Sequence, residues 1–242
     1  MISPHLVEPT QEKHLAASLD AAGLRGARPV LVVVGGAAGL TGGAEVAARQ
    51  VIEQVVMPVA VRSGAAMVDG GTDVGVMRLV GKAHAEAGAR TPLVGVAVHR
   101  LIRVPGDGRT IDSDAAGAEP HHTHLVLVPG RAWGDESPWL SAVATHLSGG
   151  RGAVTLVMNG GPIALSDVRH SVSAGRPVLV AEGTGRVADL LTGAIRGDAS
   201  VMTENGDVSL RALVGSGLIS VLRTDDPTIA QQEQLSLLLR QG

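Results

Sequence analysis

The stretch Val30-Leu31-Val32-Val33-Val34-Gly35-Gly36 decides the fold of this chain. Its unbroken apolar run is typical of a strand buried on both faces of a parallel sheet, and the glycine pair then leads into a helix-like stretch. The same order recurs at residues 66–71, 154–161 and 177–185. Because strands and helices that alternate at this spacing imply right-handed crossovers, the sequence predicts an α/β fold, a three-layer sandwich with a mostly parallel central sheet.

The glycine turns also predict where a ligand would bind. The carboxyl ends of parallel strands share one edge of the sheet, and ligands of open α/β folds bind in the crevice outside that edge. Glycine lets an anion approach the backbone N–H groups, and each helix N-terminus adds partial positive charge. We therefore expect a phosphorylated ligand at this edge.

The composition of the 242-residue chain excludes several classes of protein. It contains no cysteine, so disulfides, thiolate zinc sites and a catalytic cysteine are ruled out. A net charge of −3 without a basic block argues against nucleic acid as a partner. No apolar run reaches the ~18–20 residues of a membrane span, and the N-terminus lacks the pattern of a signal peptide. We expect a cytoplasmic globular protein with no cofactor, no metal and no membrane partner.

The rest of the chain is expected to complete one domain over residues 1–242. A polar lead-in, residues 1–27, favours only a helix at Glu12–Ala22, and residues 105–120 form a loop that is either a lid or disordered. A polar connector is expected at residues 197–210. The other expected elements are helices at Ala44–Met57, 76–87, Ser137–Leu147, Ile163–Ser173, Val187–Ile195 and Thr228–Leu239, and strands at Leu93–Ile102, Leu125–Val128 and Leu218–Leu222, so that residues 211–242 supply the last strand and helix.

Two of the glycine motifs could cradle phosphate. Gly183-Thr184-Gly185-Arg186-Val187-Ala188 fits the G-x-G-x-x-A form of the dinucleotide fingerprint, and the Arg186 guanidinium could fork onto phosphate oxygens. A tight strand-to-helix turn explains these residues equally well, and no acidic residue about 20 positions on completes a standard NAD domain. Gly70-Gly71-Thr72 could also hold phosphate, or form a turn in which Asp73 caps a helix; it is no P-loop, since no Lys-Ser or Lys-Thr follows.

Further candidates are single side chains. His122 and His124 share one side of an extended chain and could bind a transition metal, but fixing a loop or hydrogen bonding to a ligand is the favoured interpretation. Asp167 follows the third glycine turn and could act as a general acid or base, although an exposed helical aspartate is commoner. The chain has no Phe or Tyr, so Trp133 either stacks a base or plugs its loop, and Trp139 is expected to pack in a helix.

Taken in order, these motifs resemble one known superfamily. The chain is similar to the SLOG superfamily, and within it to the prokaryotic branch of the LSDAT-type domain found at the N-terminus of TRPM cation channels. The resemblance covers about residues 29–196. It rests on Gly35-Gly36-Ala37, Asp69-Gly70-Gly71-Thr72-Asp73-Val74-Gly75-Val76-Met77, His122-Thr123-His124-Leu125-Val126-Leu127-Val128, Gly160-Gly161-Pro162 and Glu182-Gly183-Thr184-Gly185-Arg186-Val187-Ala188-Asp189-Leu190-Leu191.

The resemblance implies a Rossmann-like fold that binds a nucleotide or a derivative, and the TRPM relatives include one that binds ADP-ribose in this domain. It also implies pairing into a homo-oligomer, as relatives often pair. Together with the glycine turns, it assigns ligand binding to Gly35, Gly36, Ala37, Gly70, Gly71, Thr72, Gly75, His122, Thr123, Trp133, Gly160, Gly161, Pro162, Gly183, Thr184, Gly185 and Arg186.

The predicted function is therefore binding or sensing of an adenine nucleotide derivative, such as ADP-ribose or cyclic ADP-ribose. The alternative is a nucleotide N-glycosidase or phosphoribohydrolase, because the superfamily includes enzymes resembling the LOG phosphoribohydrolases with the motif P-G-G-x-G-T-x-x-E. This chain reads Asn159-Gly160-Gly161-Pro162-Ile163-Ala164-Leu165-Ser166-Asp167, so the glycine-threonine step is lost and Asp167 stands at the glutamate position. A third class is a structural subunit of a signalling complex.

Overall fold

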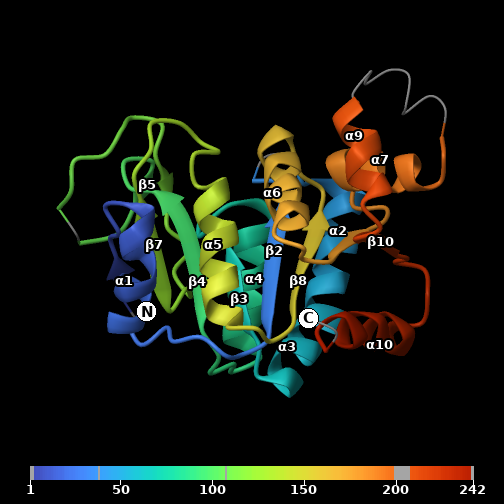
Figure 1. Ribbon diagram of the computed structural model, residues 1–242, viewed down its shortest axis with the longest axis horizontal. Coiled ribbons are helices and arrows are strands. Elements are labelled where there is room, and N and C mark those ends of the chain that lie inside the picture. Colours follow the sequence, from blue (N-terminus) through green and yellow to red (C-terminus); the bar gives the residue numbers. More distant parts are fainter. Residues whose placement is uncertain (1–2, 38, 107, 199–207, 241–242) are drawn as a thin grey trace.

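Parallel strands form the centre of the molecule, as the valine-rich runs predict (Figure 1). The computed structural model describes residues 3–37, 39–106, 108–198 and 208–240. Within them an eight-stranded sheet has the order β1-β7-β4-β3-β2-β8-β9-β10, and each of its pairings is parallel. The strands are β1 (His5–Val7), β2 (Val30–Gly35), β3 (Ala66–Asp69), β4 (Leu93–Val98), β7 (His124–Val128), β8 (Ala153–Met158), β9 (Val178–Ala181) and β10 (Ile219–Leu222).

Helices cover both faces of this sheet, which confirms the Rossmann-like three-layer sandwich. Along β2, Val30, Val32 and Val34 face one helix layer, and Leu31 and Val33 face the other, because successive side chains of a strand alternate. The first layer contains α1 (Leu15–Ala21), which follows the short η1 (Glu12–His14), together with α5 (Ser137–Ser148), α6 (Pro162–Ser173), α7 (Arg186–Ile195) and α9 (Val208–Gly215). The second layer contains α2 (Gly42–Val51), η2 (Ile52–Val56), α3 (Met57–Ser63), α4 (Gly75–Glu86) and α10 (Thr228–Leu238). No helix in the described ranges is long and apolar enough to cross a membrane.

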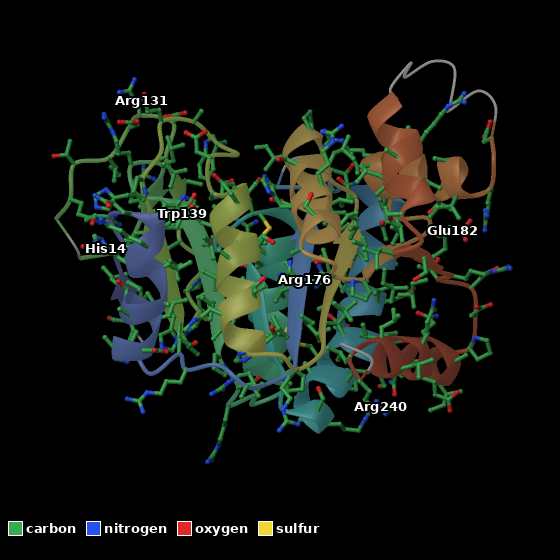
Figure 2. All side chains as sticks on the ribbon, in the orientation of Figure 1. His14, Arg131, Trp139, Arg176, Glu182 and Arg240 are labelled. Atoms are coloured by element: carbon green, nitrogen blue, oxygen red, sulfur yellow. The ribbon has the colours of Figure 1, made fainter. Side chains whose placement is uncertain are left out.

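The first helix layer contains a buried cation between α5 and α6 (Figure 2). The guanidinium of Arg176 donates to the Ser141 carbonyl at 3.0 Å and to the Thr145 hydroxyl at 2.9 Å, and its side chain is almost fully buried. This burial lowers the pKa of Arg176 to about 10. Trp139 packs in the same layer, as expected from the sequence.

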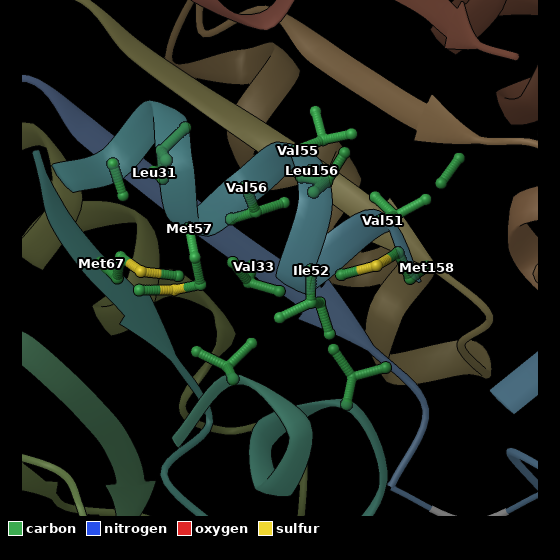
Figure 3. Packing of buried hydrophobic residues seen from close by; sticks show 14 of the residues in the cluster. Leu31, Val33, Val51, Ile52, Val55, Val56, Met57, Met67, Leu156 and Met158 are labelled. Carbon is green, nitrogen blue, oxygen red and sulfur yellow. The ribbon is translucent and has the colours of Figure 1, made fainter. Parts of the chain in front are cut away.

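The second layer is built on one long helical stretch, formed by α2, η2 and α3 (Figure 3). The sequence places the end of this helix at Met57, but it continues to Ser63. The reason is a π-type turn in η2, where the Met57 N–H bonds to the Ile52 carbonyl. This wider turn makes room for Pro58, whose ring would otherwise clash with the preceding turn. Figure 3 shows Val, Leu, Ile and Met side chains packed together in this layer, and none of the residues in this cluster is aromatic.

Three other expectations about the chain are wrong. The lead-in contains a strand as well as the expected helix, because β1 is short and forms only by pairing with β7. The expected strand Leu93–Ile102 divides into β4 and β5 (Ile102–Arg103), since the chain turns where the Leu101 N–H bonds to the Val98 carbonyl. The end of the expected connector 197–210 belongs to α9, and residues 199–207 of it lie outside the described residues.

Candidate ligand-binding site

A pocket lies at the point where the strand order of the sheet reverses. From β2 the chain proceeds to β3 and β4 on one side, whereas β8 and β9 follow on the other side. Such a switch point leaves a crevice outside the carboxyl end of the central strand. The pocket at the end of β2 has a volume of about 370 Å³, within the ~300–1,000 Å³ range of small-molecule sites. Of the predicted ligand-binding residues, it is lined by Gly35, Gly36, Ala37, Gly70, Thr72, Trp133, Gly161, Pro162 and Arg186.

The glycine turns meet at this edge and contact one another. The Val76 N–H donates to the Gly36 carbonyl at 3.2 Å, which joins the first turn to the second. Gly75 has a φ of +52°, and a Cβ there would lie 1.9 Å from the Gly36 oxygen, so only glycine fits. In the same way, the side-chain amide of Asn159 donates to the Thr184 carbonyl at 2.9 Å and joins the third turn to the fourth.

Arg186 brings positive charge to the rim of the pocket. Its Nη2 lies 3.0 Å from the position that a Cβ on Gly161 would occupy, and its Nη1 lies 3.4 Å from the corresponding position on Gly39. Its guanidinium therefore sits between the first and third turns, next to the N-terminus of α6. The backbone of Arg186 has a φ of +53°, an uncommon conformation that is typical of functional sites. Among the lining residues that the structure describes, Arg186 alone is basic.

One wall of the pocket carries two buried carboxyl groups. Burial raises the pKa of Asp167 to about 7, with the Glu136 charge adding to the rise and the Ser137 hydroxyl opposing it. Burial likewise raises the pKa of Glu136, although its backbone hydrogen bonds, including one from the Gly134 N–H at 2.9 Å, oppose the rise. Neither Oδ1 of Asp167 nor the Ser137 hydroxyl has a hydrogen bond of normal geometry among the described residues, although the hydroxyl is close enough to lower the pKa of Asp167. Asp167 is thus buried, not an exposed helical aspartate.

Apolar side chains form much of the remaining surface. Val33, Val34, Met77 and Leu140 line the pocket, and Trp133 is half-buried beside them. The Thr72 hydroxyl is buried there, and no other described group bonds to it. The site therefore combines glycine turns, one guanidinium, an indole and three carboxyl groups, those of Asp114, Glu136 and Asp167.

The fourth glycine turn does not open into this pocket. The N–H groups of Gly183 and Gly185 donate to the carboxylate of Asp189, at 2.8 and 3.1 Å, so they are occupied within the chain. Thr184 is fully buried, and its hydroxyl accepts the Asn159 N–H at 2.9 Å. Of the predicted residues in this turn, only Arg186 reaches the pocket.

Five other predicted residues do not line the pocket, namely Gly71, Gly75, His122, Thr123 and Gly160. His122 is buried between Asp69 and Glu119, with Nε2 at 2.8 Å from Asp69 and Nδ1 at 2.9 Å from Glu119. Asp69 also accepts the Gly71 N–H at 2.7 Å, so this cluster fixes the second turn. The loop-fixing interpretation of His122 agrees with this arrangement.

Thr123 lies at the amino ends of the strands, away from the pocket. Its hydroxyl bonds to both the N–H and the carbonyl of Leu93, at 3.0 and 2.9 Å. His124 interacts with the Thr123 hydroxyl at 2.8 Å and stacks on His5, with ring centroids 5.3 Å apart. His122 and His124 therefore have different partners and do not face a shared site.

Sequence reasoning missed several lining residues, among them Glu136 and Asp114. Glu136 belongs to the turn after β7, another parallel strand that ends at the same edge, so the rule used for the glycine turns finds this turn but does not single out Glu136. Asp114 comes from the 105–120 segment. That segment contains β6 (Ala116–Gly117) and is held to the second turn, where the Glu119 N–H donates to the Gly71 carbonyl at 2.9 Å. It forms a wall of the pocket.

Comparison with known proteins agrees with this architecture. The family described as "SLOG in TRPM, prokaryote" matches residues 28–231, which include all of the glycine turns. The chain belongs to this SLOG family. A mouse protein, transient receptor potential cation channel subfamily M member 2, is 24% identical over 182 residues. That match covers 59% of this chain and 12% of the mouse protein, so the chain corresponds to a small part of it. Membership in the SLOG family points to nucleotide-related binding or sensing.

Proposed function

We propose that the pocket at the end of β2 binds an adenine nucleotide derivative that contains a diphosphate, such as ADP-ribose or cyclic ADP-ribose. The observation that carries this proposal is the position of Arg186 between the first and third glycine turns. A guanidinium beside glycine-rich backbone and a helix N-terminus favours an anionic group with several oxygens.

The diphosphate would lie against the glycine turns. Arg186 would form charge-assisted hydrogen bonds to it, and the N-terminus of α6 would add its partial positive charge. The Thr72 hydroxyl, which is buried without a partner among the described residues, would donate a further hydrogen bond. These groups recognise phosphate but do not by themselves select a base.

The base and sugar would occupy the apolar part of the pocket. Trp133 offers its indole for stacking on adenine, which contributes ~1–3 kcal/mol on aromatic platforms. Met77 and Leu140 provide apolar contacts beside it. An adenine nucleotide matches this combination of an anion site and an aromatic surface.

Isothermal titration calorimetry tests the proposal, after a thermal-shift panel of AMP, NAD, ADP-ribose and cyclic ADP-ribose has chosen the ligand. Arg186→Ala should weaken binding about 10- to 150-fold, because charge-assisted hydrogen bonds contribute ~1.5–3 kcal/mol. Arg49→Ala, a change on the exposed face of α2, is the matched control and should leave affinity unchanged. A panel without any stabilising nucleotide would contradict the proposal, and unchanged affinity in Arg186→Ala would remove Arg186 from the site.

A second candidate function follows from Asp167. A buried carboxyl with a pKa of about 7 and an unpartnered oxygen is suited to proton transfer near neutral pH. In a nucleotide N-glycosidase, the bond between ribose C1′ and the base would break and the base would take the proton of Asp167. Water would then add to C1′ and return its proton to the Asp167 carboxylate. Asp167 lies at the position of the LOG glutamate.

Chromatography of the products decides between binding and hydrolysis. The protein is incubated with AMP, NAD and ADP-ribose, and free base is measured over hours. An enzyme should release base, and Asp167→Asn should lower the rate at least ~100-fold. No free base from any of the three substrates would reject the enzyme and leave the binding function.

A further inference from the structure

Two buried carboxyl groups, those of Glu136 and Asp167, form one wall of the pocket, which we call the carboxyl wall. Glu136 and Asp167 both line the pocket although they are only 7% and 8% exposed. Glu136 is fixed by the Gly134 N–H, whereas Oδ1 of Asp167 has no partner among the residues described. The buried Ser137 hydroxyl is close enough to lower the pKa of Asp167 but forms no hydrogen bond of normal geometry with it. A buried carboxyl oxygen without a hydrogen bond is costly, so a ligand hydroxyl is expected to supply the missing donor.

The wall also has a defined place relative to the phosphate site. Gly161, next to the Arg186 guanidinium, immediately precedes Pro162 at the start of α6, and Asp167 lies five residues after Pro162 in the same helix. At ~1.5 Å per residue, the separation along the helix axis is about 8 Å. If the diphosphate binds at the glycine turns, a ribose joined to it would extend from there along α6 toward Asp167. Glu136 follows Trp133 within a single turn of chain, so the sugar next to a stacked base would lie near Glu136.

We propose that Glu136 and Asp167 recognise the free hydroxyls of the ribose attached to adenine and exclude nucleotides that carry a phosphate on that ribose. The inference rests on the proposed function, because it requires an adenine nucleotide in this pocket. It assigns specificity to Glu136, a residue outside the glycine motifs.

The negative charges of the carboxyl wall explain both the recognition of free ribose hydroxyls and the exclusion of a phosphate on that ribose. A ribose hydroxyl donates to a carboxylate and satisfies the free oxygen of Asp167. A phosphate on that hydroxyl removes the donor and adds ~1.5–2 negative charges next to two carboxyl groups. Such like-charge contacts in a buried site select against the wrong ligand. No basic residue of the described lining lies close enough to offset this repulsion, since its one basic residue, Arg186, lies at the glycine turns.

The experiment compares ADP-ribose with ADP-ribose 2′-phosphate by calorimetry at pH 8, which lies above the pKa of about 7 that burial gives Asp167. The wild-type protein should bind ADP-ribose at least about 100-fold more tightly than the 2′-phosphate. Glu136→Gln and Asp167→Asn preserve shape while removing charge, and each should reduce this preference to below about 10-fold. Glu53→Gln, on the exposed face of the second helix layer, is the matched control and should keep the preference. Thermal unfolding checks that each variant is folded.

The outcomes separate this inference from the proposed function. Equal affinity of the wild-type protein for the two ligands, or a preference that survives both substitutions, overturns the inference and leaves nucleotide binding intact. Binding of neither ligand overturns the proposed function, and the inference is lost with it.

Discussion

Raising the pH above neutrality should destabilise this protein through one buried histidine. The side chain of His122 is fully buried, and its two ring nitrogens face the carboxylates of Asp69 and Glu119. Burial alone lowers the pKa of a histidine, but the charge and hydrogen bond of Asp69, followed by those of Glu119, outweigh this effect and raise the pKa of His122 to about 9. The folded state therefore holds a proton that the unfolded chain releases near pH 6.5.

The magnitude follows from these two pKa values. Because the folded pKa lies above the unfolded one, the stabilisation is fully present below pH 6.5 and is lost as the pH rises through about 9. The difference of about 2.5 pH units corresponds to roughly 3 kcal/mol of unfolding free energy, at ~1.36 kcal/mol per unit. This is a large share of the ~5–15 kcal/mol that stabilises a typical domain.

Urea unfolding at intervals between pH 6 and 9.5 measures the effect. His122 should make the wild-type free energy of unfolding fall by roughly 3 kcal/mol over this range, and His122→Gln should lack this part of the fall. The variant should keep the smaller part that Asp167 contributes as the pH rises through about 7. His14→Gln changes an exposed histidine and should behave like the wild type. Since His122→Gln leaves two buried carboxylates without their cation, it should also be destabilised by about 3–5 kcal/mol overall. NMR titration of the imidazole in the wild-type protein provides a second measurement that does not depend on this variant.

Two results would refute this reasoning. One is an imidazole of His122 that titrates near pH 6.5 in the folded protein. The other is a wild-type stability that stays constant between pH 6.5 and 9, or a slope that persists unchanged in His122→Gln.

The remaining predictions concern other buried groups. Asp167→Asn should be roughly 2–4 kcal/mol more stable than the wild type at pH 8 and equal to it at pH 4. The reason is that the folded pKa of Asp167, about 7, exceeds its ordinary value of 3.8, so the wild-type protein loses stability as the pH rises through 7. Urea unfolding at the two pH values measures this difference. Gly75→Ala should lower the free energy of unfolding by more than about 3 kcal/mol, because the added Cβ would meet the Gly36 oxygen. Gly88→Ala, with a similar φ of +58° and nothing within 4 Å, should cost only about 1 kcal/mol. Arg176→Met should cost roughly 1–3 kcal/mol in thermal unfolding, because oxygens of α5 lose their donors.

Each of these has a clear contrary outcome. Equal stability of Asp167→Asn and the wild type at pH 8 would mean that the carboxyl is not strained by burial. Equal losses in Gly75→Ala and Gly88→Ala would assign the effect to backbone conformation alone. An Arg176→Met protein as stable as the wild type would show that the hydrogen bonds of the guanidinium only balance the free energy of burying its charge.

Much of the site could be predicted because its signals are local. An apolar run followed by glycines marks the carboxyl end of a buried strand, and parallel strands bring such ends to one edge. Gly36, Gly70, Gly161 and Arg186 were found in this way, and all line the pocket. The turn after β7 ends at the same edge and supplied the prediction for Trp133, but nothing in its sequence distinguishes Glu136 from a solvent-exposed carboxylate.

Other errors came from interactions that act at a distance along the chain. The fingerprint turn at Gly183 looks open in sequence, but Asp189 turns back and occupies its N–H groups. The segment 105–120 looks like a loose loop, yet Glu119 and its neighbours hold it to the second glycine turn. Hydrogen bonds of this kind, between a turn and a side chain or segment elsewhere in the chain, leave no periodic pattern in the sequence.

The sequence by itself determined the layered sheet and the edge at which the glycine turns gather, because strand burial and glycine flexibility depend on neighbouring residues. Only the tertiary structure decided the charge states. His122 meets Asp69 across 53 positions of sequence, and Asp167 comes to lie beside Glu136 only when α5 packs on α6. Burial and partners set a pKa, and both are created by packing between distant segments.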